Sequence, residues 1–267
     1  MYVSVLTDAG VPVPDLGPAD FIVREDNVAR EVLRVEPATD PMQVAVLVDT
    51  SQQARNDIAH MRTALPQFLF ALTDGAVKNQ VAIIAFGERP TTFSDYTTNH
   101  ATLQKGVDRI WAQQGSGAYL LDAVAEISEG FKKKESPRPV IIAIAAEGGE
   151  LSFRQYDQVL DKLAGGGAAF YAMMLGTPSG SVSQEAISRN IVLDRGPSST
   201  GGRRDQLLSS MALGEKLKQL ADQLTHTYKV TYARPQSLIP PEKITVAATG
   251  PGRTAHGTVM KDQKAGR

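Results

Sequence analysis

The chain has 267 residues, of which 42% are hydrophobic and 21% charged, and its formal net charge is -1. This composition predicts a globular protein, and the near-zero charge argues against nucleic acid or an anionic membrane surface as partner. The absence of cysteine excludes disulfides, thiolate metal sites and a cysteine nucleophile. Apolar runs stay short of roughly 18 residues, so no membrane insertion is expected, and any export signal is expected to lie outside this chain.

Alternating apolar and polar residues predict β-strands at both ends of the chain. The N-terminal candidates are residues 2–5, 21–24 and 28–35, with Asp26 and Asn27 in a hairpin turn between the last two. The C-terminal candidates are residues 228–232, 244–248 and 258–260, followed by a polar tail, 261–267, that we expect to be frayed.

Between these ends, apolar strands alternate with helical patterns. The predicted strands are residues 43–48, 81–86, 91–93, 140–146 and 169–175. The predicted helices are residues 58–72, 103–111, 120–127, 156–163 and 207–224, and Pro66 is expected to bend or interrupt the first. Residues 177–202 are rich in Gly, Ser and Pro with a short apolar interruption at 191–193, and we assign no regular element to them.

This order predicts an α/β fold with a doubly wound, mostly parallel sheet and helices on both faces. Neither end has enough strands to be stable alone, so the two ends are expected to pair into one small antiparallel β-sandwich. The predicted domains are therefore a discontinuous sandwich, residues 1–37 and 227–267, and an inserted α/β domain, residues 38–226.

The candidate functional site begins where the first apolar strand of the α/β region ends. Asp49, Thr50 and Ser51 follow that strand directly. In open α/β sheets, ligands bind beyond the carboxyl ends of the strands, where helix N-termini also present free N–H groups. The pattern places oxygen ligands at this edge of the sheet.

Several segments then point to one family. Val44 to Ser51, the strand ending in Phe86 and Gly87, the run Gly-Ser-Gly-Ala-Tyr-Leu-Leu-Asp-Ala-Val at 115–124 and the strand from Ile141 to Gly148 resemble a von Willebrand factor A domain over about residues 40–226. The flanking segments 20–23, 25–27 and 228–232 resemble those of the bacterial proteins related to this family that are abundant in acidobacteria.

The resemblance implies a metal-ion-dependent adhesion site (MIDAS), in which Asp-x-Ser-x-Ser, a Thr and a further Asp hold Mg²⁺ or Mn²⁺. Asp49 and Ser51 match this pattern, whereas Gln53 replaces the second Ser, Ala118 the Thr and Glu147 the last Asp. An alanine offers no ligand, and Mg²⁺ needs several converging oxygens. We therefore predict a degenerate site that binds Mg²⁺ or Mn²⁺ weakly or not at all, with Asp122 and Ser116 as possible substitute ligands.

The resemblance further implies a non-catalytic, adhesion-type module, outside the cytoplasm, that binds a protein partner without a cofactor. The expected partner-binding residues are Asp49, Ser51, Gly117, Ala118, Tyr119 and Glu147. One alternative is a metal-dependent adhesion domain with a non-standard site. A phosphohydrolase with an aspartate nucleophile is another, but Ser51 stands where its second Asp would be needed. A cytoplasmic scaffold also stays open.

Overall fold

A computed structural model describes residues 1–178, 180, 183–234, 241 and 243–258. The chain divides into two compact units: a terminal unit, residues 1–39 and 219–267, and a central unit, residues 40–218. The predicted domains, 1–37 with 227–267 and 38–226, remain a prediction about which parts fold independently. None of the helices in the described residues is long and apolar enough to cross a membrane.

The described part of the central unit contains a six-stranded sheet in the order β10-β9-β8-β5-β6-β7. Its strands are β5 (Gln43–Val48), β6 (Gln80–Ala85), β7 (Thr91–Thr97), β8 (Pro139–Ala146), β9 (Ala169–Leu175) and β10 (Arg204–Leu207). All neighbouring strands are parallel except β7, which is antiparallel to β6 at the edge. This arrangement confirms the predicted α/β fold.

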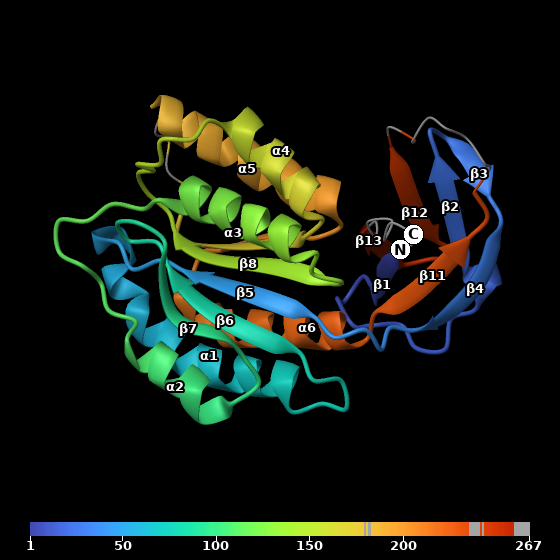
Figure 1. Cartoon of the computed structure of the whole chain (residues 1–267), viewed down its shortest axis with the longest axis horizontal. Coiled ribbons are helices and arrows are strands. Elements are labelled where there is room, and N and C mark those ends of the chain that lie inside the picture. Colours follow the sequence, from blue (N-terminus) through green and yellow to red (C-terminus); the bar gives the residue numbers. More distant parts are fainter. Residues whose placement is uncertain (179, 181–182, 235–240, 242, 259–267) are drawn as a thin grey trace. The chain divides into compact units, whose positions relative to one another are not determined.

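Helices cover both faces of this sheet (Figure 1), which is why its inner strands are almost wholly apolar. One face carries α1 (Ile58–Thr73) and α2 (His100–Asp108), and the other carries α3 (Leu120–Lys134), α4 (Tyr156–Gly166) and α5 (Gln184–Thr200). The short helix η2 (Gln52–Asn56) precedes α1, which continues through Pro66 rather than being interrupted there. Helix α4 ends at a glycine C-cap, because Gly167 adopts φ +68° there.

Helix α5 is the main departure from the expected elements, because it occupies most of the segment to which none was assigned. Ser183 caps it by accepting a hydrogen bond from the N–H of Ala186, and its inner side buries Arg189, Val192 and Leu193. Residues with low helix propensity near its C-terminal end predict an irregular segment, but tertiary packing outweighs such propensities. The helix expected from residue 207 begins later, since β10 and η3 (Ser210–Ala212) precede α6 (Leu213–Thr225).

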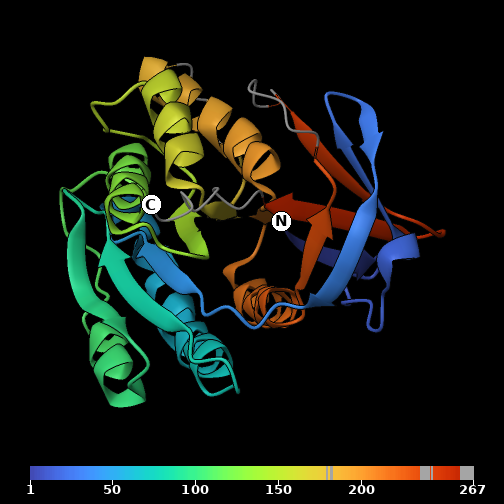
Figure 2. The ribbon, with the colours of Figure 1, turned by 45° about the vertical axis from the view of Figure 1, so that its right-hand side comes forward.

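The terminal unit brings strands from both chain ends side by side, as Figure 2 shows. Its described strands form two antiparallel sheets, β13-β1-β11-β4 and β12-β2-β3, whose side chains share one apolar core. The elements are β1 (Tyr2–Thr7), η1 (Pro18–Asp20), β2 (Phe21–Glu25), β3 (Val28–Arg30), β4 (Val32–Pro37), β11 (Tyr228–Tyr232), β12 (Ile244–Ala248) and β13 (Arg253–Thr258). Asp26 and Asn27 form the predicted turn with positive φ. Residues 259–260 and the tail 261–267 lie outside the described residues.

Candidate functional site

Asp49 lies at the point where the sheet order reverses, between the carboxyl ends of β5 and β8. Its side chain is fully buried. One carboxylate oxygen accepts a hydrogen bond from the N–H of Ser51 (2.8 Å) and the other from the N–H of Ala146 (3.0 Å). Burial raises the pKa of Asp49, and the hydrogen bonds from Ser51 and Ala146 oppose that rise. Asp49 thus joins the ends of the two central strands.

Ser51 and Gln53 continue this first loop in different directions. Ser51 is fully buried. Its hydroxyl is close enough to Asp49 to lower the pKa of that carboxyl. Among the described residues, this hydroxyl has no hydrogen-bond partner of ordinary geometry. The Gln53 amide donates to the carbonyl of Gly149 (3.3 Å). Gly148 has φ +152°, and a Cβ there would lie 1.6 Å from the Gln53 Oε1. Gln53 therefore packs across the loop that follows β8.

The second loop presents no side-chain oxygen at the position where the resemblance requires one. Ala118 is only 4% exposed, and its carbonyl accepts a hydrogen bond from the N–H of Leu151 (2.8 Å). A Cβ on Gly117 would lie 2.1 Å from Leu151 Cδ1, so the Leu151 side chain lies directly over this glycine and would have to move for a larger residue. The Ser116 hydroxyl donates to the carbonyl of Gln113 within its own loop (2.8 Å). This loop packs against the one after β8.

Glu147, the expected last ligand, is paired with a cation from the protein itself. Its Oε2 lies 3.1 Å from Arg189 Nη2, and the exposed fractions of the two side chains are 7% and 2%. Arg189 Nη1 also donates to the carbonyl of Gly148 (2.7 Å). Sequence reasoning missed Arg189 because it lies in the segment without an assigned element. The available signal was its helical spacing from Ala186 and Val192.

Asp122 and Glu150 hold the loop after β8 in other ways. The Asp122 carboxylate accepts hydrogen bonds from the N–H groups of Phe153 (3.1 Å) and Arg154 (3.3 Å), so it anchors this loop to the first turn of α3. Glu150 is 2% exposed and accepts from the N–H of Ser152 (3.2 Å). Burial raises the pKa of Glu150 to about 7, despite hydrogen bonds from Ser152 and the weaker effect of Arg189.

These residues do not fit a divalent ion well. Ala118 has no ligand atom, the Gln53 amide is bonded to Gly149, and Glu147 already has a guanidinium beside it. In the described ranges, no group of three or more His, Cys, Asp or Glu side chains is arranged to hold a metal. The predicted weak or absent metal binding stays a prediction.

Large apolar side chains are exposed on the loops at this edge. Leu151 is 50% exposed and Phe153 88%, and the Phe153 ring lies 6.2 Å from that of Tyr119. Leu208 and Met211, which follow the carboxyl end of β10, are 73% and 81% exposed. Exposed large apolar side chains that lie together, as Phe153 does beside Tyr119, are typical of an interaction site.

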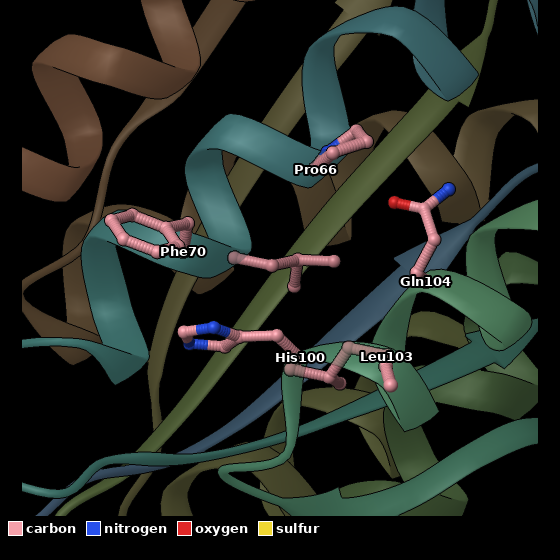
Figure 3. A pocket seen from close by; sticks show the side chains of 7 residues that line it. Pro66, Phe70, His100, Leu103 and Gln104 are labelled. Atoms are coloured by element: carbon pink, nitrogen blue, oxygen red, sulfur yellow. The ribbon is translucent and has the colours of Figure 1, made fainter.

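A groove lies between α1 and α2, away from these loops (Figure 3). This groove, of about 360 Å³, has Phe70 and His100 at one side, with their rings 4.8 Å apart. The ring nitrogen Nε2 of His100 lies 2.8 Å from the Thr73 hydroxyl, so a structural contact accounts for this histidine. The groove contains none of the predicted site residues.

Residues 44–149 match the family described as von Willebrand factor type A domain, and none of the curated proteins matches the chain. A solved von Willebrand factor type A structure from Catenulispora acidiphila is 12% identical, with a TM-score of 0.53, over 84% of this chain and 50% of that one. BatB from Bacteroides thetaiotaomicron is 14% identical, with a TM-score of 0.51, over 68% of this chain and 98% of that one. The central unit thus has the fold of a von Willebrand factor type A domain.

Proximal thread matrix protein 1 from the mussel byssus is also similar, at 15% identity and a TM-score of 0.55, over 74% of this chain and 49% of that one. Another structure of the same mussel protein, with a TM-score of 0.51, has a zinc-occupied MIDAS motif. The chain spans about half the length of the first structures that it matches. At these identities the likeness establishes the fold alone.

Proposed function

We propose that this von Willebrand factor type A domain is a non-catalytic interaction module that binds a protein partner through its carboxyl-edge loops without a divalent ion. The observation that carries the proposal is the exposure of Phe153 and Leu151 beside Tyr119. Aromatic side chains at loop tips supply large contact area, and such residues dominate binding energy at interfaces. Tyr119, which is partly exposed, adds to this contact surface. The Glu147 side chain is only 7% exposed, so it supports this surface from below.

Asp49, Ser51, Gly117 and Ala118 have a different part in this proposal. All four are buried, so they support the loops that form the contact surface and do not contact the partner through their side chains. Asp49 joins β5 to β8, and Gly117 allows Leu151 to pack closely.

The phosphohydrolase alternative needs an accessible aspartate nucleophile. Asp49 is fully buried and both its oxygens accept backbone hydrogen bonds, which argues against attack on a substrate. The metal-dependent alternative draws its support from the zinc-occupied motif of the mussel protein. The ion pair of Glu147 with Arg189 argues against that reading for this chain. Location outside the cytoplasm and membership of the acidobacterial subgroup belong to the same proposal.

The test uses a photo-crosslinking phenylalanine analogue at Phe153, with Phe70 as the matched control. Phe70 is also in the central unit and 52% exposed, but it borders the groove between α1 and α2. We expect a discrete adduct with one protein from position 153, formed equally in EDTA and in Mg²⁺, and no such adduct from position 70. With the purified partner, Phe153→Ala should weaken binding by about tenfold or more, and Phe70→Ala should leave it unchanged.

Equal labelling from both positions would contradict the proposed surface. An adduct that forms only with Mg²⁺ would favour the metal-dependent alternative.

A further inference from the structure

Arg189 is among the largest fully buried side chains of the protein, although arginine is rarely buried without a strong partner. It reaches from α5 to the loop after β8, where its two terminal nitrogens contact different groups. Nη2 lies 3.1 Å from the Glu147 carboxylate, and Nη1 lies 2.7 Å from the Gly148 carbonyl. One guanidinium therefore neutralises a buried carboxylate and fixes the adjacent backbone.

The segment from Glu147 to Gly149 is held from a second direction as well. Gln53 donates to the Gly149 carbonyl, and its Oε1 packs against Gly148, where a Cβ would displace the Gln53 side chain and where φ of +152° also disfavours one. Arg189 in α5 and Gln53 in η2 thus contact the same three-residue segment from two sides. The segment needs no added ion to become ordered, because both contacts are internal.

Charge explains why this arrangement competes with a metal. Glu147 stands in the position that the family pattern gives to a metal-ligating carboxylate. A guanidinium 3.1 Å away already supplies the positive charge that a buried carboxylate requires. A divalent ion bound to the same carboxylate would have to approach this fixed cation or displace it, and both events cost free energy.

We propose that Arg189 takes the place of a divalent ion as the positive charge that pairs with Glu147. Its contacts also hold the Glu147–Gly149 segment in the conformation seen here. Arg189 is thus a positioning residue for the site described under the proposed function, on whose location this inference rests. The consequence is a contact surface that is permanently formed and does not respond to Mg²⁺ or Mn²⁺.

The experiment measures Mn²⁺ binding by electron paramagnetic resonance, and thermal unfolding with and without 10 mM Mn²⁺, and it needs no partner. The wild type should bind no Mn²⁺ through Glu147. Arg189→Gln should lower the unfolding midpoint of the central unit by roughly 10 °C, because a buried carboxylate loses the guanidinium that contacts it. Mn²⁺ should then bind to this variant and restore part of that loss.

Two further variants assign the effect to the pair. Glu147→Gln/Arg189→Gln should unfold at a higher temperature than Arg189→Gln and bind no Mn²⁺, since the carboxylate is gone. Arg154→Gln is the matched control, because Arg154 lies in the same loop but is 35% exposed. It should leave Mn²⁺ binding unchanged and lower the unfolding midpoint by only about 1–2 °C. Arg189→Lys keeps the charge and covers the case in which Arg189→Gln does not fold: it should exclude Mn²⁺ as the wild type does.

Three results would overturn the inference. Mn²⁺ binding to the wild type that disappears in Glu147→Gln would show that the guanidinium does not replace the ion. A folded Arg189→Gln protein that binds no Mn²⁺ would reduce Arg189 to a structural support. Mn²⁺ binding by Arg189→Lys would show that positive charge is not what excludes the metal. A failed crosslinking test would leave all three readings intact, so the two proposals can fail separately.

Discussion

The two units each bury a glutamate against arginine, but in different ways. In the terminal unit, Glu25 is 3% exposed and contacts Arg30 (3.0 Å), Arg234 (3.2 Å) and the Tyr232 hydroxyl (3.1 Å). Its two arginines are 24% and 34% exposed, so water reaches them. In the central unit, Glu147 pairs with Arg189, which is only 2% exposed.

The difference shows what depends on each pair. Glu25 and Arg30 are five residues apart across one hairpin, so local chain geometry brings them together. Glu147 and Arg189 are 42 residues apart, and their meeting depends on how α5 packs against the sheet. Glu25 belongs to a partly solvated group with two arginines, whereas Glu147 and Arg189 are both buried. Loss of either member of the second pair therefore removes the nearest opposite charge from a group that water does not reach.

Neutralising each glutamate in turn should separate the two units most clearly. Glu147→Gln should destabilise the central unit by roughly 3–5 kcal/mol, because Arg189 would stay buried without the carboxylate that contacts it. Glu25→Gln should cost the terminal unit only about 1 kcal/mol, because its arginines can turn to water. Native-state hydrogen exchange, followed at β8 and at β2, measures the two units separately. Equal losses would mean that solvent access to the arginines does not control the cost.

Glu150 makes the stability of the central unit depend on pH. Its folded-state pKa of about 7 lies above the ordinary value of 4.5, so the folded state binds more protons between these pH values. Stability of the central unit should therefore fall as pH rises from 4.5 to 7, by roughly 3 kcal/mol from this group. Glu150→Gln should remove that component, leaving the variant more stable than the wild type at pH 8 and similar to it at pH 4. Urea unfolding at several pH values checks this, and an unchanged pH profile would contradict it.

The smallest effect is expected for a half-exposed ion pair in the same loop as Glu147. Arg154 lies 3.4 Å from Asp122, and its side chain is 35% exposed. Arg154→Ala should cost about 0.5 kcal/mol in urea unfolding, because exposed pairs in high dielectric contribute little. The Asp122 carboxylate would keep its bonds to the N–H groups of Phe153 and Arg154. A loss above about 2 kcal/mol would mean that this half-exposed pair stabilises the protein as strongly as a buried pair does.

Much of the architecture was determined by the sequence alone. Continuous apolar runs, such as the one before Asp49, predict strands covered on both faces, and the alternation with helical spacing predicts a parallel sheet. The turn at Asp26 and Asn27 was predictable because these residues tolerate positive φ. The position of Asp49 at a strand end likewise follows from local pattern. The absence of a ligand atom at Ala118 could be read from residue identity.

The charge pairing and the exposed side chains at the site depend on tertiary contacts. Helix α5 forms although Gly196 and Pro197 disfavour it, because the burial of Val192 and Leu193 outweighs local propensity. That helix delivers Arg189 to Glu147, and no local signal specifies a pairing across 42 residues. The exposure of Phe153 likewise depends on Asp122 in α3, whose carboxylate accepts a hydrogen bond from the Phe153 N–H and so positions the loop. Period and residue type are local properties of a chain, whereas charge pairing and burial arise from contacts between distant segments.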